Sequence, residues 1–258
     1  DLGTSAVKLL LMDGEGRIHK IVSKEYPLYF PHPGWSEQKP EDWYEQTMAG
    51  IKELIAEADK SQIAGISFGG QMHGLVILDD QDQVIRPAIL WNDGRTYEEC
   101  DYLNNVIGKD KLSEYTANIS FTGFTAPKIL WVKKNEPENF ARIKKIMLPK
   151  DYIAYRLTGV HCTDVSDASG MLLFDVKNRC WSKEMLEWKS STSPSVALLK
   201  RPPQSFIAFL LMRGQVNRPR EKFRFKSIVP CFPARVKSRA CIFCALIATL
   251  NAVSLTFS

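Results

Sequence analysis

The sequence opens with DLGTSAVKLLLMDGEGRIHKIVSKEYPLY, residues 1–29, and this stretch decides the fold that we expect. The apolar run from Ala6 to Asp13 predicts a strand, and the two glycines that flank Glu15 supply turn conformations. The loosely alternating run from Ile18 to Tyr29 predicts a second strand. Together they predict a long β-hairpin, with residues 1–5 forming a loop directly before its first strand.

The next elements alternate between helix and strand. Pro40 followed by two acidic residues predicts a helix start, and apolar residues at helical spacing carry this helix to Ala58. The short, β-branched run from 63 to 68 predicts a buried strand that ends in a glycine pair. The runs 75 to 78 and 84 to 91 predict another hairpin.

A mostly helical region then occupies residues 96 to 157. Thr96 with Glu99 three residues later matches a capping box, Thr125 begins a further helix, and Gly159 ends the last one. Residues 171 to 176 return to a strand. The order strand, strand, helix, strand, strand and then helices predicts a mixed α/β fold in which hairpins lie beside crossover units.

The loop before the first strand combines a carboxylate, a glycine and two hydroxyls, from Asp1, Gly3, Thr4 and Ser5. Gly3 lets the backbone approach an anion, the two hydroxyls offer donors, and Asp1 can attract magnesium directly or through water. An ordinary turn at a strand edge is the alternative interpretation. The sequence has no G-x-x-x-x-G-K-[ST], which excludes a Walker-type phosphate loop.

A second polar loop follows the strand predicted at 63 to 68, and it reads Gln71-Met72-His73-Gly74. The ends of strands are where α/β proteins gather ligands. His73 and Gln71 can each donate to or accept from a sugar hydroxyl, and Met72 can cover an apolar face. A lone loop histidine also fits a purely structural role. The loop is therefore a candidate sugar site, and the other polar loops of the sequence decide between the sugar-binding and the structural interpretation.

A third loop, Trp91-Asn92-Asp93-Gly94-Arg95, follows the predicted strand 84 to 91. It offers a stacking surface at Trp91 and polar groups suited to polyol hydroxyls, Asp93 among them. The alternative is a helix-entry loop in which Asp93 and Arg95 pair with each other. Carbohydrate sites need several hydrogen-bonding groups on one face, and two such loops 20 residues apart can converge there.

These loops belong to an ordered set of segments that resembles the FGGY carbohydrate kinase family, and most of all its xylulokinase branch. The set comprises residues 1–5, 71–74, 91–95, 123–128, 148–152 and 163–169. The resemblance covers residues 1 to about 188, most of the family's first domain. It implies a ribonuclease H-like domain of the actin and sugar kinase superfamily, with a mixed sheet and flanking helices.

The resemblance also implies an activity, the transfer of the γ-phosphoryl group of ATP to the 5-hydroxyl of D-xylulose, with ATP and magnesium as cofactors. Asp1 then lies near the magnesium and the transferred phosphate, while Met72 and His73 bind the ketopentose. Trp91 and Asp93 are further candidates for sugar contacts. Gluconate, ribulose and glycerol kinases share the fold, so related polyols stay open as substrates.

Two departures from the family limit this expectation. The chain begins inside the family's first strand, and no aspartate occurs after Asp175, although the family's catalytic aspartate lies in a later G-x-G-D loop. The resemblance therefore implies that this chain lacks the catalytic base and the second domain, and is inactive by itself. The alternative is a non-catalytic sugar-binding or regulatory protein built on a kinase half.

The composition changes abruptly beyond Trp188. Residues 189–258 hold twelve of the 34 basic residues and one of the 29 acidic residues, so this tail carries +11 and residues 1–188 carry −6. All six Trp and all eight Tyr lie at or before Trp188. Ordinary domains differ less than this. We therefore divide the chain into a kinase-like domain, 1–188, and an unrelated, poorly ordered basic tail, 189–258, and attribute the tail to a frameshift or a splicing error.

The remaining expectations concern partners. The basic tail lacks a nucleic-acid recognition motif, so no specific nucleic acid is expected. The apolar stretch Ala240 to Phe257 is just long enough to span a bilayer, but polar residues interrupt it, and we favour chance apolarity over a membrane anchor. The scattered cysteines and the lack of a signal peptide indicate a cytoplasmic protein. The oligomeric state stays open, with a homodimer among the options.

Overall fold

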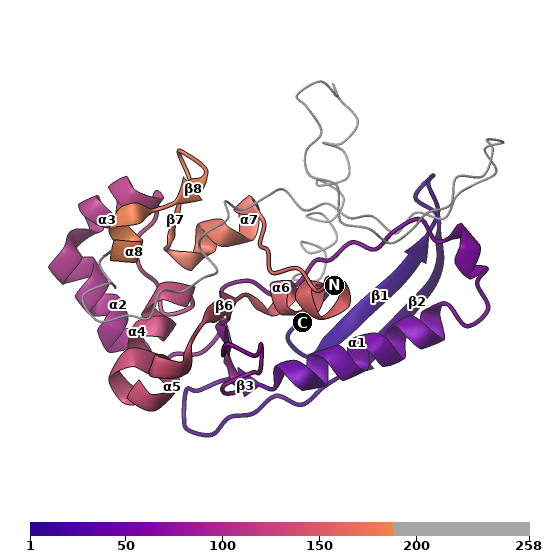
Figure 1. Cartoon of the computed structure of the whole chain (residues 1–258), viewed down its shortest axis with the longest axis horizontal. Helices are drawn as coiled ribbons and strands as arrows, with labels where there is room; N and C mark the ends of the chain where they lie inside the picture. Colours follow the sequence, from indigo (N-terminus) through magenta and orange to yellow (C-terminus); the bar gives the residue numbers. More distant parts are fainter. Residues whose placement is uncertain (188–258) are drawn as a thin grey trace, which may run out of the picture. The chain divides into compact units, whose positions relative to one another are not determined.

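The computed structural model describes residues 1–187 (Figure 1), so the predicted tail and its apolar stretch lie outside the described residues. The strands are β1 (Ala6–Met12), β2 (Ile18–Glu25), β3 (Glu37–Gln38), β4 (Val76–Leu78), β5 (Ala88–Ile89), β6 (Lys145–Met147), β7 (Phe174–Asp175) and β8 (Cys180–Trp181). The α-helices are α1 (Pro40–Leu54), α2 (Tyr97–Tyr102), α3 (Lys109–Thr116), α4 (Thr125–Asn135), α5 (Pro137–Arg142), α6 (Pro149–Thr158), α7 (Val165–Ala168) and α8 (Lys183–Glu187). Two short segments are 3-10 helices, η1 (Lys60–Gln62) and η3 (Ser169–Met171), and one is a π-helix, η2 (Leu103–Gly108).

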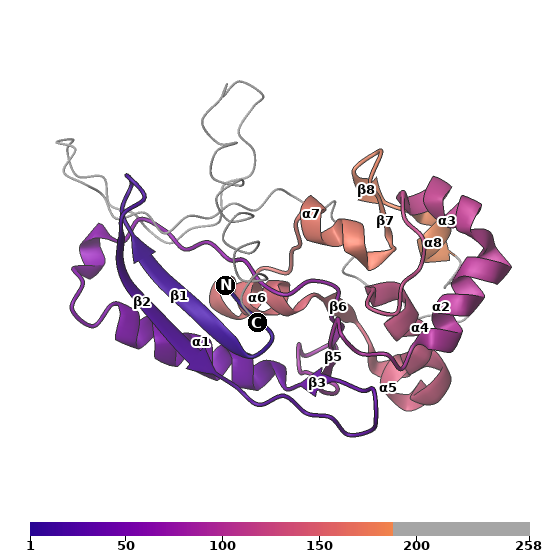
Figure 2. The same cartoon turned by 180° about the vertical axis from the view of Figure 1, so that it is seen from behind.

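The predicted first hairpin is confirmed. β1 and β2 pair antiparallel from Ala6 opposite Glu25, with a register shift beside the turn. The helix α1 lies along both strands in both views (Figures 1 and 2). Its Trp43 is fully buried in one apolar cluster with β1, and Leu54 closes a smaller one between the hairpin and the helix end. The burial of this apolar face, more than helix propensity, holds α1 in place.

The buried strand predicted at 63 to 68 is wrong. These residues form no ladder, and Ile66 is 39% exposed. Ile63 forms an isolated bridge at the start of the segment, and beyond its end Leu2 forms an isolated parallel bridge with Gly70. A β-branched run becomes a strand when neighbouring strands pair with its backbone, and none of the described residues forms a strand pairing along 64 to 68.

The second predicted hairpin is confirmed in a distorted form. Leu78 lies opposite Val84, and Leu75 lies opposite Ile89, so the returning segment contains two extra residues. The hairpin is extended on both sides by elements that the sequence did not reveal, because β5 pairs with β3 and β4 pairs with β6. The resulting order is β3-β5-β4-β6, which gives the mixed arrangement of strands and flanking helices that we expected.

The helical region follows the prediction at most of its boundaries. α4 begins at Thr125, and α6 ends at Gly159, whose φ of 72° is left-handed. α2 begins after Thr96, as predicted, but the prediction of a capping box there is wrong. The Thr96 hydroxyl donates to Thr122 O (3.0 Å) and caps no helical N–H. The hydroxyl has a tertiary partner across the loop, which a local motif cannot reveal.

The last predicted strand is shorter than expected. Of residues 171 to 176, only Phe174 and Asp175 form a strand, β7, because η3 takes up the residues up to Met171. Leu172 follows with a φ of 59°, which breaks the extended run. Phe174 still lies in the main apolar cluster with residues of α3 and α4. Within residues 1–187, we find no helix with the length and apolarity needed to cross a membrane.

Candidate functional site

The structure brings the first loop into contact with both of the other candidate loops. The Gln71 backbone N–H donates to Leu2 O at 2.7 Å, and the Trp91 indole N–H donates to the Thr4 hydroxyl at 3.0 Å. Residues 1–5 therefore lie between the loop at 71–74 and the loop at 91–95. The sequence separates these three segments by up to 90 residues, and the fold joins them.

The first loop is partly open to solvent. Asp1 and Ser5 are exposed, and the Gly3 N–H donates to Ala6 O at 3.0 Å. A side chain at Gly3 would place its Cβ 3.0 Å from that same oxygen, so the tight turn favours glycine. The Thr4 hydroxyl accepts from Trp91 and keeps its own hydrogen to donate.

Gln38 of β3 links these loops, and the sequence did not reveal it. Its buried amide donates to Thr4 O (2.7 Å) and to Pro27 O (3.1 Å). Its oxygen accepts from the Trp43 indole (3.0 Å) and from the Gln71 amide (3.2 Å). A glutamine in a two-residue strand has no motif around it, so only the tertiary structure identifies it as the support of the first loop.

His73 stands in an unusual backbone conformation. Its φ is 65°, and the Gly74 N–H donates to Met72 O at 2.7 Å, which closes a three-residue γ-turn around the histidine. Gly74 also lies close to Pro149, whose Cγ would be 2.7 Å from an added Cβ. Strained turns of this kind occur where a side chain must be aimed, and here the turn aims the imidazole.

The His73 imidazole is held on two sides. Its Nδ1 lies 3.1 Å from Gly170 O, and its ring stacks on Phe124 with centroids 4.8 Å apart and an interplanar angle of 27°. A carbonyl only accepts, so Nδ1 carries the hydrogen. Burial lowers the pKa of His73, with the Gly170 bond opposing this and the Lys128 charge adding to it. In the neutral ring, Nε2 then presents a lone pair that can accept from a hydroxyl.

Gly170 is the residue that admits the imidazole. A Cβ at this position would lie 2.1 Å from His73 Cε1 and 2.3 Å from Nδ1. Only glycine leaves room for the ring at this position, because every other residue type would add a Cβ that clashes with it. The Gly170 carbonyl can then accept the hydrogen bond from the imidazole. This pairing of residues 73 and 170 was not predicted, although residues 163–169 had been recognised as a family segment.

Trp91 and Asp93 have different surroundings. The Trp91 side chain is 47% exposed, as expected of a stacking surface. Asp93 is 1% exposed, and its two oxygens accept from the Ser36 N–H (2.6 Å) and from the Arg95 backbone and guanidinium (2.8–2.9 Å). The guanidinium lies over Trp35, 3.7 Å from the ring centroid. This is the pairing of Asp93 with Arg95 that formed the alternative interpretation of the loop.

A cluster of charged side chains around Lys150 lies close to His73. Lys150 contacts Asp151 and Asp167 at 3.1 Å each, and Asp164 more closely. Burial opposes the charge of Lys150, but its pKa is raised because three carboxylates surround it. The Asp167 carboxylate also acts on His73 and favours its charged form. The cluster ties α6 to α7, directly before the η3 turn that holds Gly170.

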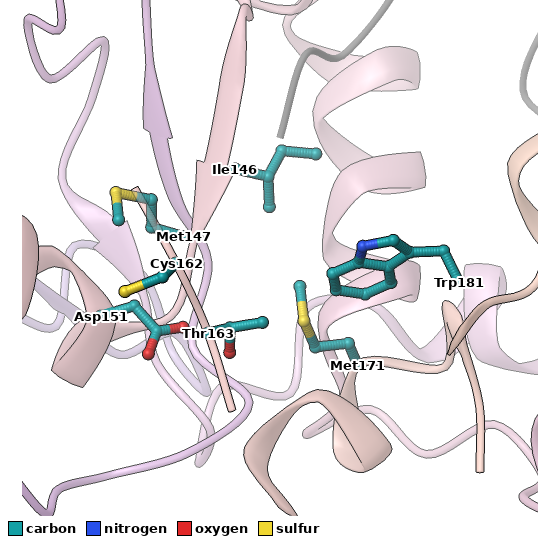
Figure 3. A pocket seen from close by; sticks show the side chains of 7 residues that line it. All are labelled: Ile146, Met147, Asp151, Cys162, Thr163, Met171 and Trp181. Atoms are coloured by element: carbon teal, nitrogen blue, oxygen red, sulfur yellow. The ribbon is translucent and has the colours of Figure 1, made fainter. Parts of the chain in front are cut away.

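A small cavity lies beside Asp151, one carboxylate of this cluster (Figure 3). Its volume is about 10 Å³, space for about one water, and its polar lining comes from Asp151, Cys162 and Thr163. Burial raises the pKa of Asp151 to about 6, and the Lys150 charge opposes this rise. None of the predicted site residues lines the cavity, so it is separate from the candidate sugar site.

The first loop fits magnesium in one of the ion's usual modes. Among residues 1–187, no three acidic, histidine or cysteine side chains gather into a metal cluster. Magnesium in kinase sites is held by one or two carboxylates together with substrate phosphates and water. The exposed Asp1 carboxylate, in the same short loop as Thr4 and Ser5, meets that limited requirement. Magnesium binding at Asp1 stays a prediction.

A family profile matches most of the chain. The profile described as "FGGY family of carbohydrate kinases, N-terminal domain" covers residues 1–199. Among curated proteins, xylulose kinase from Lactococcus lactis is 48% identical over 190 residues, which is 72% of this chain and 38% of that protein. Xylulose kinase from Bacillus subtilis is 48% identical over 187 residues, or 72% of this chain and 37% of that protein.

Solved structures give the same assignment. A protein described as a "xyloylose kinase" from Brucella ovis is 45% identical, with a TM-score of 0.71, over 74% of this chain and 39% of that chain. A gluconate kinase from Lactobacillus acidophilus is 28% identical, with a TM-score of 0.72, over 79% of this chain and 40% of that chain. The chain thus spans about two fifths of the length of the relatives it matches.

Proposed function

The chain belongs to the FGGY family of carbohydrate kinases, and from that membership we propose that it supplies the sugar-binding and phosphate-facing half of an ATP-dependent kinase site. The observation that carries the proposal is the meeting of three loops, in which Thr4 contacts Trp91 and Leu2 contacts Gln71. A sugar held between Trp91 and His73 would lie beside the loop that faces the phosphate.

The proposed reaction converts D-xylulose to D-xylulose 5-phosphate. The 5-hydroxyl oxygen bonds to the γ-phosphorus of ATP, the bond from that phosphorus to the bridging oxygen breaks, and ADP leaves. The hydroxyl proton must pass to a base, which the described residues do not provide at this site. Such transfers depend mainly on positioning and on stabilising charge. The ketopentose is favoured by the two relatives that carry the name xylulose kinase and are 48% identical.

Each of the predicted residues receives a role in this proposal. Neutral His73 accepts a hydrogen bond from a sugar hydroxyl at Nε2, and Met72 and Trp91 cover apolar faces of the sugar. Gly3, Thr4 and Ser5 face the phosphates, and Asp1 faces the magnesium. Gln71 and Gly74 shape the loop around the histidine. We assign Asp93 to holding its own loop, because both of its oxygens are already bonded within the protein.

A second candidate function rests on one specific observation. The proposed sugar-contacting residues all lie within residues 1–187, and the contacts that hold Trp91 and His73 there come from this region alone. A chain of this composition could bind the sugar and respond to it without phosphorylating it. In that case, binding of D-xylulose would occur with no dependence on ATP.

Calorimetric titration of the full chain with D-xylulose tests the proposed sugar site. We expect saturable binding that Trp91→Ala and Met72→Ala weaken, since each variant removes an apolar surface from the site. His19→Asn is the matched control, because His19 lies on β2 and pairs with Asp13. Binding that all of these variants leave unchanged would place the sugar elsewhere.

A further inference from the structure

Lys128 is buried beneath the carbonyls of residues 122–124, a setting that is rare for lysine. It belongs to the first turn of α4, its side chain is fully buried, and no carboxylate forms an ion pair with it among the described residues. Its amine donates instead to three backbone carbonyls, Thr122 O (3.1 Å), Phe124 O (3.0 Å) and Gly123 O. A buried charge with neutral partners is expensive, so its retention calls for an explanation.

The local sequence gives part of that explanation. Gly123 lies just before the N-cap of α4, Phe124, so its carbonyl lies outside the hydrogen-bond ladder of the helix and needs a donor from elsewhere. The Lys128 amine supplies that donor. It also binds the carbonyls on either side, so one side chain fixes the backbone of the whole loop 122–124.

The loop 122–124 touches a proposed sugar contact on each side. Gly123 packs on the backbone of Trp91, where an added Cβ would lie 2.8 Å from Trp91 O. The Phe124 ring stacks on the His73 imidazole, and the adjacent Thr125 hydroxyl donates to His73 O at 3.0 Å. A movement of this loop would therefore move both side chains together.

We propose that Lys128 is a positioning residue of the sugar site, which ties down the loop 122–124 and thereby sets Trp91 and His73 relative to each other. What these two side chains bind rests on the proposed function, whereas the contacts that position them do not. Lys128 itself is enclosed by the loop, so it acts through Trp91 and His73 and makes no contact with the sugar.

Burial and the carbonyl partners act in opposite directions on the protonation of the Lys128 amine. Burial lowers the pKa of Lys128 to about 7, while Asp93 opposes this and Arg95 adds to it. His73 is the other titratable group that faces it. The three carbonyls favour the charged form, because an ammonium has three donors and a neutral amine has two.

The test compares Lys128→Met with Lys134→Met in the full chain. Methionine keeps the length of the side chain and removes its donors, and Lys134 is an exposed lysine on the same helix. Nuclear magnetic resonance of the sugar-free chain would follow the Trp91 indole N–H and the His73 ring. We expect Lys128→Met to shift both signals and to weaken D-xylulose binding about tenfold, with Lys134→Met unchanged in both respects.

The outcomes separate positioning from general support. A folded Lys128→Met chain with both signals at their wild-type positions would overturn the proposal. Should that variant fail to fold, Gly123→Ala pushes the same loop away from Trp91 while keeping the lysine. Shifts at both Trp91 and His73 in Gly123→Ala support coupling through the loop, and a shift at Trp91 alone refutes it. Absence of D-xylulose binding by the wild type would refute the proposed function and leave these signals as the test of positioning.

Discussion

At the scale of single residues, His73 combines a constrained backbone with a free ring nitrogen. Its γ-turn has a φ of 65°, a region that asparagine tolerates better than most residues do. The substitution His73→Asn therefore removes the imidazole while leaving the turn in place. Any loss of function then reports on the ring itself, whereas His73→Ala would combine that loss with backbone strain.

We expect His73→Asn to weaken D-xylulose binding about fivefold, the equivalent of one hydrogen bond of about 1 kcal/mol. The wild-type affinity should also fall as the pH drops below the lowered pKa of His73, because protonated Nε2 can no longer accept. Titration calorimetry across pH 5 to 8 measures both effects. An affinity that stays constant over this range in both proteins would contradict the proposed acceptor role.

Lys128 leads to a prediction about stability and pH. Its folded pKa, about 7, lies below its ordinary value of 10.5, so the unfolded chain binds more protons between these values. The stability of the folded chain should therefore rise with pH across that window and decrease as the pH falls toward 7. Denaturant unfolding of the wild type and Lys128→Met at several pH values measures this, since the variant lacks the titrating group. Parallel pH profiles for the two proteins would show that Lys128 has an ordinary pKa.

At the scale of secondary structure, η3 contains Gly170, whose carbonyl oxygen binds the His73 imidazole. Gly170→Ala should displace the imidazole, because the new Cβ would lie 2.1 Å from His73 Cε1. We expect a loss of about 1–3 kcal/mol in the free energy of unfolding, together with weaker sugar binding. Gly14→Ala is the matched control, because an added Cβ there meets nothing within 4 Å. Equal stability and affinity for the two variants would show that the ring moves aside freely.

The sequence predicted elements whose causes are local. The hairpin β1–β2 follows from alternation and a glycine turn, and α1 and α4 follow from proline and spacing. The segment 63 to 68 was missed because a strand requires a partner, and the capping box at Thr96 because its hydroxyl has a partner at Thr122. No pattern in the sequence indicates the two-residue strand β3.

The residues of the candidate site also fall into those that the sequence revealed and those that only the fold revealed. The three polar loops were found because each contains several functional groups in one short segment. Gln38, Lys128 and Gly170 were not found, because each acts through backbone atoms that only the fold brings near. Motifs thus locate groups that can meet a ligand, and they miss the residues that hold those groups in place.

At the scale of the whole molecule, the family profile reaches residue 199, beyond the boundary at 188 that composition predicts. The change in charge and aromatic content still calls for a cause, and we retain a shift of reading frame as the hypothesis. Sequencing of transcript and locus across codons 180 to 200 tests it. We expect an uninterrupted gene to encode a G-x-G-D loop in another frame, and a single continuous frame through the tail would refute the hypothesis.

The proposed half-site also predicts what the whole chain does with ATP. Phosphoryl transfer needs a positioned base and a closed environment around the γ-phosphate, and the loops at Asp1, His73 and Trp91 provide contacts to one side only. We therefore expect this chain to bind D-xylulose and to release ADP no faster than its His73→Asn variant. A coupled ADP-release assay with and without D-xylulose measures this. Sugar-dependent ADP release by the wild type alone would show that a base is present in the chain after all, and the search for it would then begin among the glutamates that follow Asp175.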